Sequence, residues 1–316
     1  MRDSNVLTIG ESMVLFVADE VGSIEEVKNF TKYSAGAEMN VAIGLSRLGI
    51  NSYYVTKLGE DAFGSYLTSI LEEENINTDY VQYDDKHQTG FMLKEKAENG
   101  SDPKVHYYRK NSAASKLNKD ELNIDFDKID HIHLSGVYLG VSQSALESTF
   151  YIATEAKKRN IPVTFDPNLR PLVWNSREDM RKYTNALAAI SDYFMPGIAE
   201  AKILCGEEDP KKIAAYYHNI GVETVIIKLG ADGAFVQKNG EESLYVAGFK
   251  VDNIVDTVGA GDGFATGIIY SLVRGFNMKE TLLNANAIGA IQLSSASDNE
   301  ALPTREQLHN FKHGNK

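Results

Sequence analysis

The sequence predicts an α/β fold in which a mostly parallel central sheet carries helices on both faces and a small β-sheet forms a lid. Two observations lead to this prediction. Short apolar runs alternate with stretches of helical periodicity along most of the chain, and two segments in its first third break that alternation. Repeated strand–helix units are typical of parallel sheets, because each crossover places a helix against one face. The composition of the 316 residues, 43% apolar and 24% charged, is that of an ordinary globular protein.

The individual elements follow from periodicity and from stop signals. The expected strands are Asn5–Gly10, Ser52–Leu58, His131–Ser135, Val163–Asp166, Asp192–Met195 and Thr224–Leu229. The expected helices are Ala37–Leu48, Phe63–Glu74, Ser144–Arg159, Arg177–Ile190, Lys211–Asn219, Gly263–Arg274 and Met278–Ser295. In the first helix Val41, Leu45 and Leu48 share one face, and Gly49 is a stop signal. A last helix is expected after Thr304, which has the spacing of a capping box with Gln307.

The two segments without this alternation are expected to form the lid. Met13–Tyr33 contains strand-like pieces and no convincing helix. Phe91–Lys94 and Val105–Arg109 flank the polar stretch Glu98–Pro103 and read as an antiparallel hairpin. We therefore expect a single domain over residues 1–316 with a β-lid built from about 12–33 and 88–110.

Charge and cysteine content exclude several classes of protein. The net charge is −12, from 32 Lys+Arg and 44 Asp+Glu. General nucleic-acid binding needs a basic face, so no nucleic-acid partner is expected. No apolar run approaches the ~18 residues of a membrane span, and Met1–Gly10 does not resemble a signal peptide. The single Cys205 excludes an intramolecular disulfide and is expected to be a small buried hydrophobe. These features predict a cytoplasmic protein that does not bind a membrane.

The strongest local signal is the glycine-rich stretch Asp256–Phe264, which opens an expected helix. Glycines at 259, 261 and 263 allow a tight turn, and the amides that follow form an anion cradle at the helix N-terminus. Asp262 lies inside this cradle, where its carboxylate would repel a bound anion. Its presence there is explained if the carboxylate accepts a proton from an attacking hydroxyl. A glycine-rich helix start with an acidic N-terminal residue remains an alternative. The Rossmann and P-loop patterns do not match.

The stretch Asp256–Asp262 resembles the signature of the ribokinase/PfkB family of sugar kinases. Further matching stretches are Gly36–Ala42, Leu48–Gly49, Gly59–Gly64 and Lys228–Ala234. The resemblance covers most of the chain and implies the ribokinase-like three-layer fold. It also implies phosphorylation of a hydroxymethyl group with ATP and Mg²⁺. Asp262 aligns with the family's base, and Gly259, Ala260, Gly261 and Asp262 align with its anion hole.

Two more stretches narrow the subfamily. Tyr107–Ser115, and Phe165–Arg170 with Trp174 after it, resemble 2-keto-3-deoxygluconate kinases. The resemblance implies a sugar pocket that contains Asp262 together with Gly36, Ala37, Asn40, Phe91, Tyr107, Arg109, Arg170 and Asp298. Arginine binds carboxylates bidentately, so two arginines suit a sugar acid better than a neutral sugar. A fructokinase or ribokinase of the same fold is the first alternative, and a sugar-acid sensor without catalysis is the second.

The nucleotide side rests on the same resemblance. The implied nucleotide-binding residues are Asn168, Arg170, Lys228, Gly230, Gly233, Gly259, Gly261 and Asn286. Glu200 is expected to hold Mg²⁺ through a water, although Gly197 stands where many family members have an asparagine. Whether a monovalent cation assists the reaction remains open. His131 and His133 are expected to be structural, and exposed lid strands favour a homo-oligomer. The partners implied are ATP and a small sugar acid.

Overall fold

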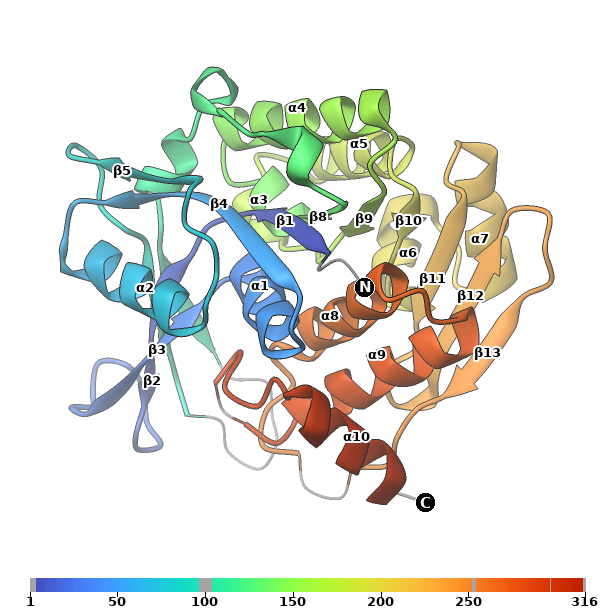
Figure 1. Ribbon diagram of the computed structural model, residues 1–316. Coiled ribbons are helices and arrows are strands. Elements are labelled where there is room, and N and C mark those ends of the chain that lie inside the picture. Colours follow the sequence, from blue (N-terminus) through green and yellow to red (C-terminus); the bar gives the residue numbers. More distant parts are fainter. Residues whose placement is uncertain (1–3, 97–103, 252–253, 296, 315–316) are drawn as a thin grey trace.

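The central feature of the computed structural model is a nine-stranded sheet in the order β13-β12-β11-β10-β9-β8-β1-β4-β5 (Figure 1). The structure describes residues 4–96, 104–251, 254–295 and 297–314. Neighbouring strands from β5 to β11 pair in parallel, and β12 and β13 extend one edge in antiparallel pairing. The strands are β1 (Asn5–Ile9), β4 (Asn51–Gly59), β5 (Val81–Asp84), β8 (His131–Ser135), β9 (Val163–Asp166), β10 (Tyr193–Phe194), β11 (Thr224–Lys228), β12 (Gly233–Lys238) and β13 (Leu244–Ala247).

Helices cover both faces of this sheet and bury a core on each side. One face carries α3 (Gly136–Leu139), α4 (Gln143–Arg159), α5 (Arg177–Ala188), α6 (Ile198–Cys205) and α7 (Pro210–Asn219). The other carries α1 (Ala37–Arg47), α2 (Ala62–Glu73), α8 (Ala260–Val273), α9 (Met278–Gln292) and α10 (Arg305–Gly314). Short 3-10 turns occur at Ala113–Lys116, Lys119–Glu121, Phe126–Lys128, Pro171–Val173 and Gly230–Asp232. The predicted three-layer α/β fold is confirmed.

The lid is a separate four-stranded sheet in the order β3-β2-β6-β7. Its strands are β2 (Met13–Ala18), β3 (Phe30–Ala35), β6 (Phe91–Lys94) and β7 (Val105–Tyr108). The antiparallel pairing of β6 with β7 is the expected hairpin, and its connecting residues 97–103 lie outside the described residues. One face of the lid buries Met13, Leu15, Val17 and Met92 together. The other packs Phe16 and Phe91 toward the helices of the main body.

Most expected elements agree with the structure to within a few residues. Gly49 has a left-handed φ of +70° directly after α1, and Thr304 and Gln307 make the reciprocal bonds of a capping box. Helix α8 begins at Ala260 rather than at Gly263. Residues 249–251 and 254–255, just before the glycine-rich turn, belong to no strand. The short helix α6 and the antiparallel edge strands β12 and β13 were not among the predicted elements.

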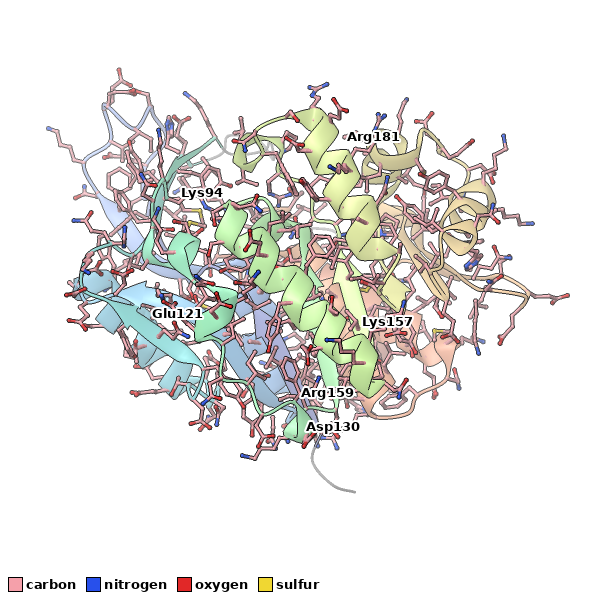
Figure 2. The ribbon with its side chains drawn as sticks, turned by 90° about the horizontal axis from the view of Figure 1, so that it is seen from above. Lys94, Glu121, Asp130, Lys157, Arg159 and Arg181 are labelled. Carbon is pink, nitrogen blue, oxygen red and sulfur yellow. The ribbon has the colours of Figure 1, made fainter. Side chains whose placement is uncertain are left out.

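The surface of α4 illustrates how local charge supports a helix (Figure 2). Lys157, Lys158 and Arg159 occupy its last turn, where positive charge complements the helix dipole, and Asn160 ends it in the left-handed conformation.

Cys205 is half-buried, and its thiol donates to the Ala201 carbonyl oxygen at 3.1 Å. Among the described helices, none combines the length and apolar character needed to cross a membrane.

Candidate active site

A cleft of about 160 Å³ lies between the lid and the carboxyl ends of the parallel strands. Such strand ends are where open α/β sheets place their ligands. The cleft is lined by Met13, Gly36, Ala37, Asn40, Met92, Tyr107, Arg109, Val137, Asn168, Arg170, Lys228, Thr257, Val258, Gly259, Gly261, Asp262 and Asp298. Most residues that the sequence singled out for substrate and phosphate therefore meet in one place, although they come from segments far apart in the chain.

Asp262 lies in the first turn of α8, where two asparagine amides hold its carboxylate. Asn40 Nδ2 donates to Asp262 Oδ2 at 2.8 Å, and Asn168 Nδ2 donates to Asp262 Oδ1 at 3.2 Å. Burial raises the pKa of Asp262 to about 7, against the lowering effect of the Asn40 amide. Nearby Asp166 also raises this pKa, whereas Arg170 lowers it. A buried carboxyl with a pKa near neutrality, held in place by neutral donors, is suited to general-base chemistry.

The glycines at the start of α8 serve three different purposes. Gly259, the N-cap, has a φ of +81°, and a Cβ there would collide with the Asp298 carbonyl oxygen. Gly261 has an ordinary helical conformation, and a Cβ on it would meet nothing within 4 Å. A Cβ on Gly263 would lie 3.2 Å from the Ile288 carbonyl oxygen, so the glycine allows close packing of α8 on α9. The first amides of α8 have no intrahelical acceptor, so they are available to an anion at the open face of Gly261.

A buried ion-pair cluster supports the segment that carries Asn168. Lys228 Nζ lies 2.7 and 2.9 Å from the two Asp166 carboxylate oxygens and 3.5 Å from Glu200 Oε2. Burial opposes the charge of Lys228, but the attraction of Asp166 and Glu200 raises its pKa above the ordinary value. Asp166 Oδ1 accepts the backbone N–H of Asn168, and this bond helps to hold Asn168 at its left-handed φ of +32°. Lys228 lines the cleft, but its charge is already neutralised by these carboxylates.

Glu200 is bound to the backbone on both carboxylate oxygens. Its Oε1 accepts from the Leu169 N–H at 2.8 Å, and its Oε2 accepts from the Gly197 N–H at 2.7 Å. Each carboxylate oxygen has a second lone pair, so one water on either remains compatible with these bonds. Oxygen donors of this kind suit Mg²⁺, which usually keeps several waters and takes few protein ligands. Within the described residues, no group of three or more His, Cys, Asp or Glu side chains could hold a metal ion.

The two arginines of the predicted sugar pocket differ in their partners. Arg109 Nε donates to Glu11 Oε2 at 2.8 Å, its terminal guanidinium nitrogen forms an ion pair with the same oxygen, and Glu11 is only 2% exposed. Arg170 donates to the Leu169 carbonyl oxygen at 3.1 Å and forms no ion pair with the described residues. Arg109 therefore already has a buried counter-ion in Glu11, and its predicted contact with the sugar acid stays a prediction.

One wall of the cleft corrects the prediction for Phe91. In the register of β6 and β7, Met92 pairs with Tyr107 and both line the cleft, whereas Phe91 pairs with Tyr108 on the opposite face. The Phe91 ring is stacked on Tyr108 with centroids 4.7 Å apart and packs against Phe63 at 5.6 Å. Phe91 thus belongs to the packing between lid and body, and its neighbour Met92 contacts the cleft. Successive side chains of a strand point to opposite faces, so an error of one position exchanges the two faces.

Three of the predicted nucleotide residues lie away from this cleft. Asn286 is buried on α9, and its amide nitrogen donates to the Val246 and Ala247 carbonyl oxygens of β13 at 3.1 Å each. Gly230 and Gly233 flank the turn from β11 to β12 with φ values of +62° and +110°. A Cβ at Gly233 would collide with the Val246 carbonyl oxygen, whereas Gly230 faces open space. Their nucleotide-binding role stays a prediction.

Asp298 reaches the cleft from the loop that follows α9. Burial raises its pKa above the ordinary value, and Lys94 Nζ of the lid lies 3.5 Å from its Oδ1. Lys94 also forms an ion pair with Asp256, whose carboxylate accepts the Val258 N–H at 3.0 Å. The lid is thereby linked electrostatically to the glycine-rich turn.

Sequence reasoning missed Glu11, Met92 and Asn299. Asn299 is 5% exposed and donates to Asn40 Oδ1 at 2.9 Å. For Glu11 a signal existed: an acidic residue directly follows an apolar strand that ends in glycine, and strand ends of this kind line ligand sites. Nothing in the local pattern around Asn299 distinguishes it from an ordinary loop asparagine.

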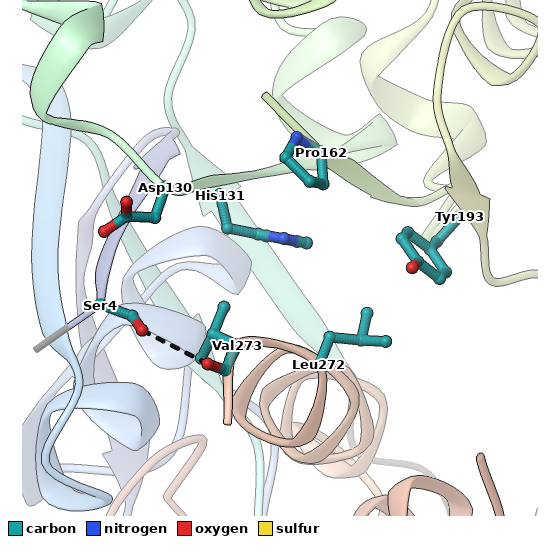
Figure 3. A pocket seen from close by; sticks show the side chains of 7 residues that line it. All are labelled: Ser4, Asp130, His131, Pro162, Tyr193, Leu272 and Val273. Atoms are coloured by element: carbon teal, nitrogen blue, oxygen red, sulfur yellow. Dashed lines mark hydrogen bonds between the residues drawn. The ribbon is translucent and has the colours of Figure 1, made fainter. Parts of the chain in front are cut away.

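A second cavity of about 270 Å³ lies at the amino ends of the strands, far from these residues in the sheet (Figure 3). It is lined by Ser4, Asp130, His131, Pro162, Tyr193, Leu272 and Val273. The Ser4 hydroxyl donates to the Val273 carbonyl oxygen at 3.4 Å. Burial lowers the pKa of His131 to about 4 and of His133 to about 3, and Thr164 Oγ1 bonds to both rings. Both histidines are therefore neutral parts of the sheet core, as expected.

A parallel sheet and a β-lid enclose an aspartate at a glycine-rich helix start, an arrangement that suits phosphoryl transfer to a small hydroxylated molecule. The sequence matches the pfkB family of carbohydrate kinases over residues 3–305, and the chain belongs to this family. It is 41% identical over 309 residues to 2-dehydro-3-deoxygluconokinase of Bacillus subtilis (strain 168), a match that spans 97% of this chain and 95% of that protein. The resemblance inferred from the motifs is confirmed, and the sensor alternative is dropped, because the chain is a kinase.

Solved structures agree on the fold. A PfkB protein from Polaromonas sp. JS666 superposes with a TM-score of 0.88 at 38% identity, covering 97% of this chain and 99% of that one. An E. coli protein crystallised with ATP and Mg²⁺ superposes with a TM-score of 0.89 at 24% identity over 98% of this chain and 99% of its own. The second likeness concerns the fold alone.

Proposed function

We propose that this kinase transfers the γ-phosphoryl group of ATP to the C6 hydroxyl of 2-keto-3-deoxygluconate, also called 2-dehydro-3-deoxygluconate. The product is 2-keto-3-deoxy-6-phosphogluconate. The observation that carries the proposal is the buried carboxylate of Asp262, held by Asn40 and Asn168 beside the open amides of the Gly259–Gly261 turn. The 41% identical relative of Bacillus subtilis supports the choice of sugar acid.

In this mechanism Asp262 accepts the proton of the C6 hydroxyl as that oxygen attacks the γ-phosphorus. The amides of Ala260, Gly261 and Asp262 donate to the transferring phosphoryl oxygens, on which negative charge is concentrated. The bond from the γ-phosphorus to the bridging oxygen breaks, and ADP leaves. Electrostatic positioning of this kind is the main catalytic contribution in phosphoryl transfer. The lid strands β2, β6 and β7 cover the sugar and exclude water, which would otherwise hydrolyse ATP.

Glu200 fits the expected role of holding Mg²⁺ through a water, because its two oxygens keep free lone pairs and its side chain is 19% exposed. When bound, Mg²⁺ neutralises charge on the ATP phosphates. Lys228 limits how strongly this carboxylate attracts a cation, since the ammonium lies 3.5 Å from Glu200 Oε2. Arg170 is the cleft cation suited to the sugar carboxylate or the phosphates.

A coupled ADP-release assay over a panel of sugars tests the substrate. The panel contains 2-keto-3-deoxygluconate, its galactonate epimer, fructose and ribose, each with ATP and Mg²⁺. The expected result is the highest kcat/KM on a 2-keto-3-deoxy sugar acid. Comparable efficiency on fructose would overturn the sugar-acid proposal in favour of the fructokinase alternative, which the Glu11 counter-ion of Arg109 keeps open. Omitting K⁺ from the assay tests the open question of a monovalent cation.

The lid supports a further expectation, that the chain forms a homo-oligomer. Strand β7 is at the edge of the lid sheet, and its Tyr107 and Tyr108 are 42% and 51% exposed. Edge strands with exposed aromatic residues favour pairing with another copy. Sedimentation equilibrium of the purified protein measures the assembly, and a monomer at all concentrations would contradict it.

A further inference from the structure

The loop that follows α9 reaches the base through a chain of amide hydrogen bonds. Asn299 Nδ2 donates to the Ser34 carbonyl oxygen at 3.1 Å and to Asn40 Oδ1 at 2.9 Å. Asn40 Nδ2 in turn donates to Asp262 Oδ2 at 2.8 Å. The side chains of Asn299, Asn40 and Ser34 are all buried, with 5%, 1% and 5% exposure. Water therefore cannot readily replace a lost partner in this chain.

The direction of each bond follows from the first acceptor. A backbone carbonyl can only accept, so the Ser34 oxygen requires the nitrogen end of the Asn299 amide. That nitrogen can only donate, so it requires the oxygen end of the Asn40 amide. Asn40 must then present its nitrogen to Asp262, as a carboxylate base requires. In the flipped orientation, Asn40 would set its oxygen against the carboxylate and oppose its ionised form.

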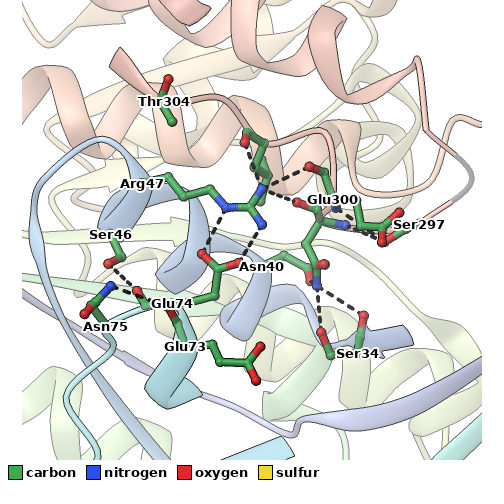
Figure 4. Close-up of polar contacts among 12 residues, drawn as sticks. Ser34, Asn40, Ser46, Arg47, Glu73, Glu74, Asn75, Ser297, Glu300 and Thr304 are labelled. Carbon is green, nitrogen blue, oxygen red and sulfur yellow. Dashed lines mark hydrogen bonds and ion pairs between the residues drawn. The ribbon is translucent and has the colours of Figure 1, made fainter. Parts of the chain in front are cut away.

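The loop that carries Asn299 is held rigidly by Arg47 of α1. One terminal guanidinium nitrogen of Arg47 donates to the carbonyl oxygens of Asn299 at 3.0 Å, Glu300 at 3.0 Å and Leu302 at 2.9 Å. Its Nε and its other terminal nitrogen bind the Glu74 carboxylate at 3.0 and 2.6 Å. Figure 4 shows these contacts around Arg47, together with Ser34 and Asn40. The loop is thereby tied to two helices, and the Asn299 amide is pre-organised.

We propose that Asn299 is a positioning residue for phosphoryl transfer, which fixes the orientation of the Asn40 amide and through it the ionised, correctly aimed form of Asp262. The inference rests on the proposed role of Asp262 as the base. Asn299 lies outside the cleft lining and makes no contact with the space in which the substrate would bind. It acts through Asn40 alone.

The pH profile separates this role from a merely structural one. The charged groups that act on Asp262 are Asp166, Arg170, Lys228, Asp298 and the buried Glu38. Asn299→Leu changes none of them, but it frees Asn40 to turn, and losing a donor to the ionised form raises the pKa of a carboxyl. The expected result is a kcat about fivefold lower at neutral pH, and an acid limb of the kcat profile that moves up by about one pH unit. The KM for ATP should stay unchanged.

A double-mutant cycle with Asn40→Ala is the decisive control. If Asn299 acts through Asn40, Asn299→Leu should have little further effect on kcat or on the acid limb in the Asn40→Ala background. An effect that persists there, for example through the adjacent Asp298, would overturn the proposal. Ser34→Ala is the matched control for the fold, because it keeps the backbone carbonyl and removes only a 3.3 Å contact with the Ser34 hydroxyl. Thermal unfolding checks that each variant is folded.

Failure of this inference and failure of the proposed function give different results. If Asp262→Asn retains wild-type turnover, the base assignment fails and the inference falls with it. If Asp262→Asn is inactive while Asn299→Leu keeps the wild-type acid limb, the base assignment stands and only the role of Asn299 is refuted.

Discussion

At the scale of single residues, the surroundings of Asp262 are notable because its direct side-chain partners are neutral. Two asparagine amides donate to it, whereas the nearby cations Arg109 and Lys228 are bound to other carboxylates. A cation bound directly to Asp262 would lower the pKa of the carboxyl and weaken it as a base. Neutral donors instead fix the position of the Asp262 carboxylate and leave its pKa at about 7, which suits proton transfer near pH 7.

Replacing Asp262 by asparagine tests the base. Asp262→Asn keeps the shape of the side chain and should lower kcat by ~10²–10⁴, the usual contribution of a positioned base. The melting temperature should fall only modestly, because the substitution removes a buried charge and keeps an acceptor oxygen for one asparagine amide, while the other amide loses its acceptor. Asp85→Asn, at an exposed position, makes the same charge change away from the cleft and should have wild-type kinetics. Near wild-type turnover of Asp262→Asn would remove the base assignment.

The pH dependence of the wild type follows from the same carboxyl. Asp262 must be ionised to accept a proton, and burial raises its pKa to about 7. The value of kcat/KM should therefore fall by up to tenfold per pH unit below about pH 7, since it reports the free enzyme. Phosphate groups titrate near pH 6 and could mimic this limb. The residual activity of Asp262→Asn measures that contribution separately, and an identical profile in both proteins would refute the expected limb.

At the scale of elements, the first turn of α8 offers a matched pair of glycine substitutions. Gly261→Ala places a methyl group in open space at a helical φ, so it should stabilise the fold by up to about 1 kcal/mol. The same methyl group narrows the space beside the amides, so kcat should fall. Gly259→Ala forces a left-handed φ and a collision with the Asp298 carbonyl oxygen, so the protein should lose stability. Thermal unfolding and ADP release measure both effects. Full activity of Gly261→Ala would refute the phosphate cradle.

The elements also show how far the sequence could predict the structure. Long helices with a clear cap, such as α1 before Gly49 and α10 after Thr304, could be predicted because the signal is local. The eight-residue helix α6 could not, because its length is close to two turns and its cap is the unusual pair of Gly197 and Glu200. The sequence predicts that Phe91 of β6 faces the cleft, whereas in the structure Met92 does. A strand pattern alone does not show which face meets a ligand.

The site shows the same division between local and distant information. The glycine-rich turn and Asp262 are adjacent in the sequence, so their chemistry could be inferred directly. The partners of Arg109 and Asn40 come from positions about a hundred or more residues away, as the pairings with Glu11 and Asn299 show. Such contacts arise from the topology of the sheet, and no spacing rule for a single sequence contains them.

At the scale of the whole molecule, this protein carries a negative net charge, although the ligands proposed for it are anions as well. The net charge is −12, and the cleft gathers Arg109, Arg170 and Lys228. Glu11 neutralises Arg109, and Asp166 with Glu200 neutralises Lys228, so these two cations mainly organise the protein. Arg170, by contrast, forms no ion pair within the part of the chain that the structure describes. The preference for a sugar acid should therefore depend on Arg170 far more than on Arg109.

Comparing Arg170→Ala with Arg109→Ala tests this division. Arg170→Ala should leave thermal unfolding unchanged and lower kcat/KM on 2-keto-3-deoxygluconate by ~10²-fold, since charge-assisted bonds contribute about 1.5–3 kcal/mol. Its effect on fructose should be smaller, so discrimination between the two sugars should weaken. Arg109→Ala leaves Glu11 buried without its counter-ion and should destabilise the fold by about 3–5 kcal/mol.

Two further variants control these expectations. Arg177→Ala, at an exposed position of α5, removes the same charge away from the cleft and should behave as wild type. Glu11→Gln combined with Arg109→Met removes both buried charges and should recover part of the stability lost in Arg109→Ala, because a buried pair costs most when one partner remains alone. If Arg109→Ala instead unfolds at the wild-type temperature and loses only its preference for the sugar acid, then Arg109 is the carboxylate ligand and the assignment to Arg170 is wrong.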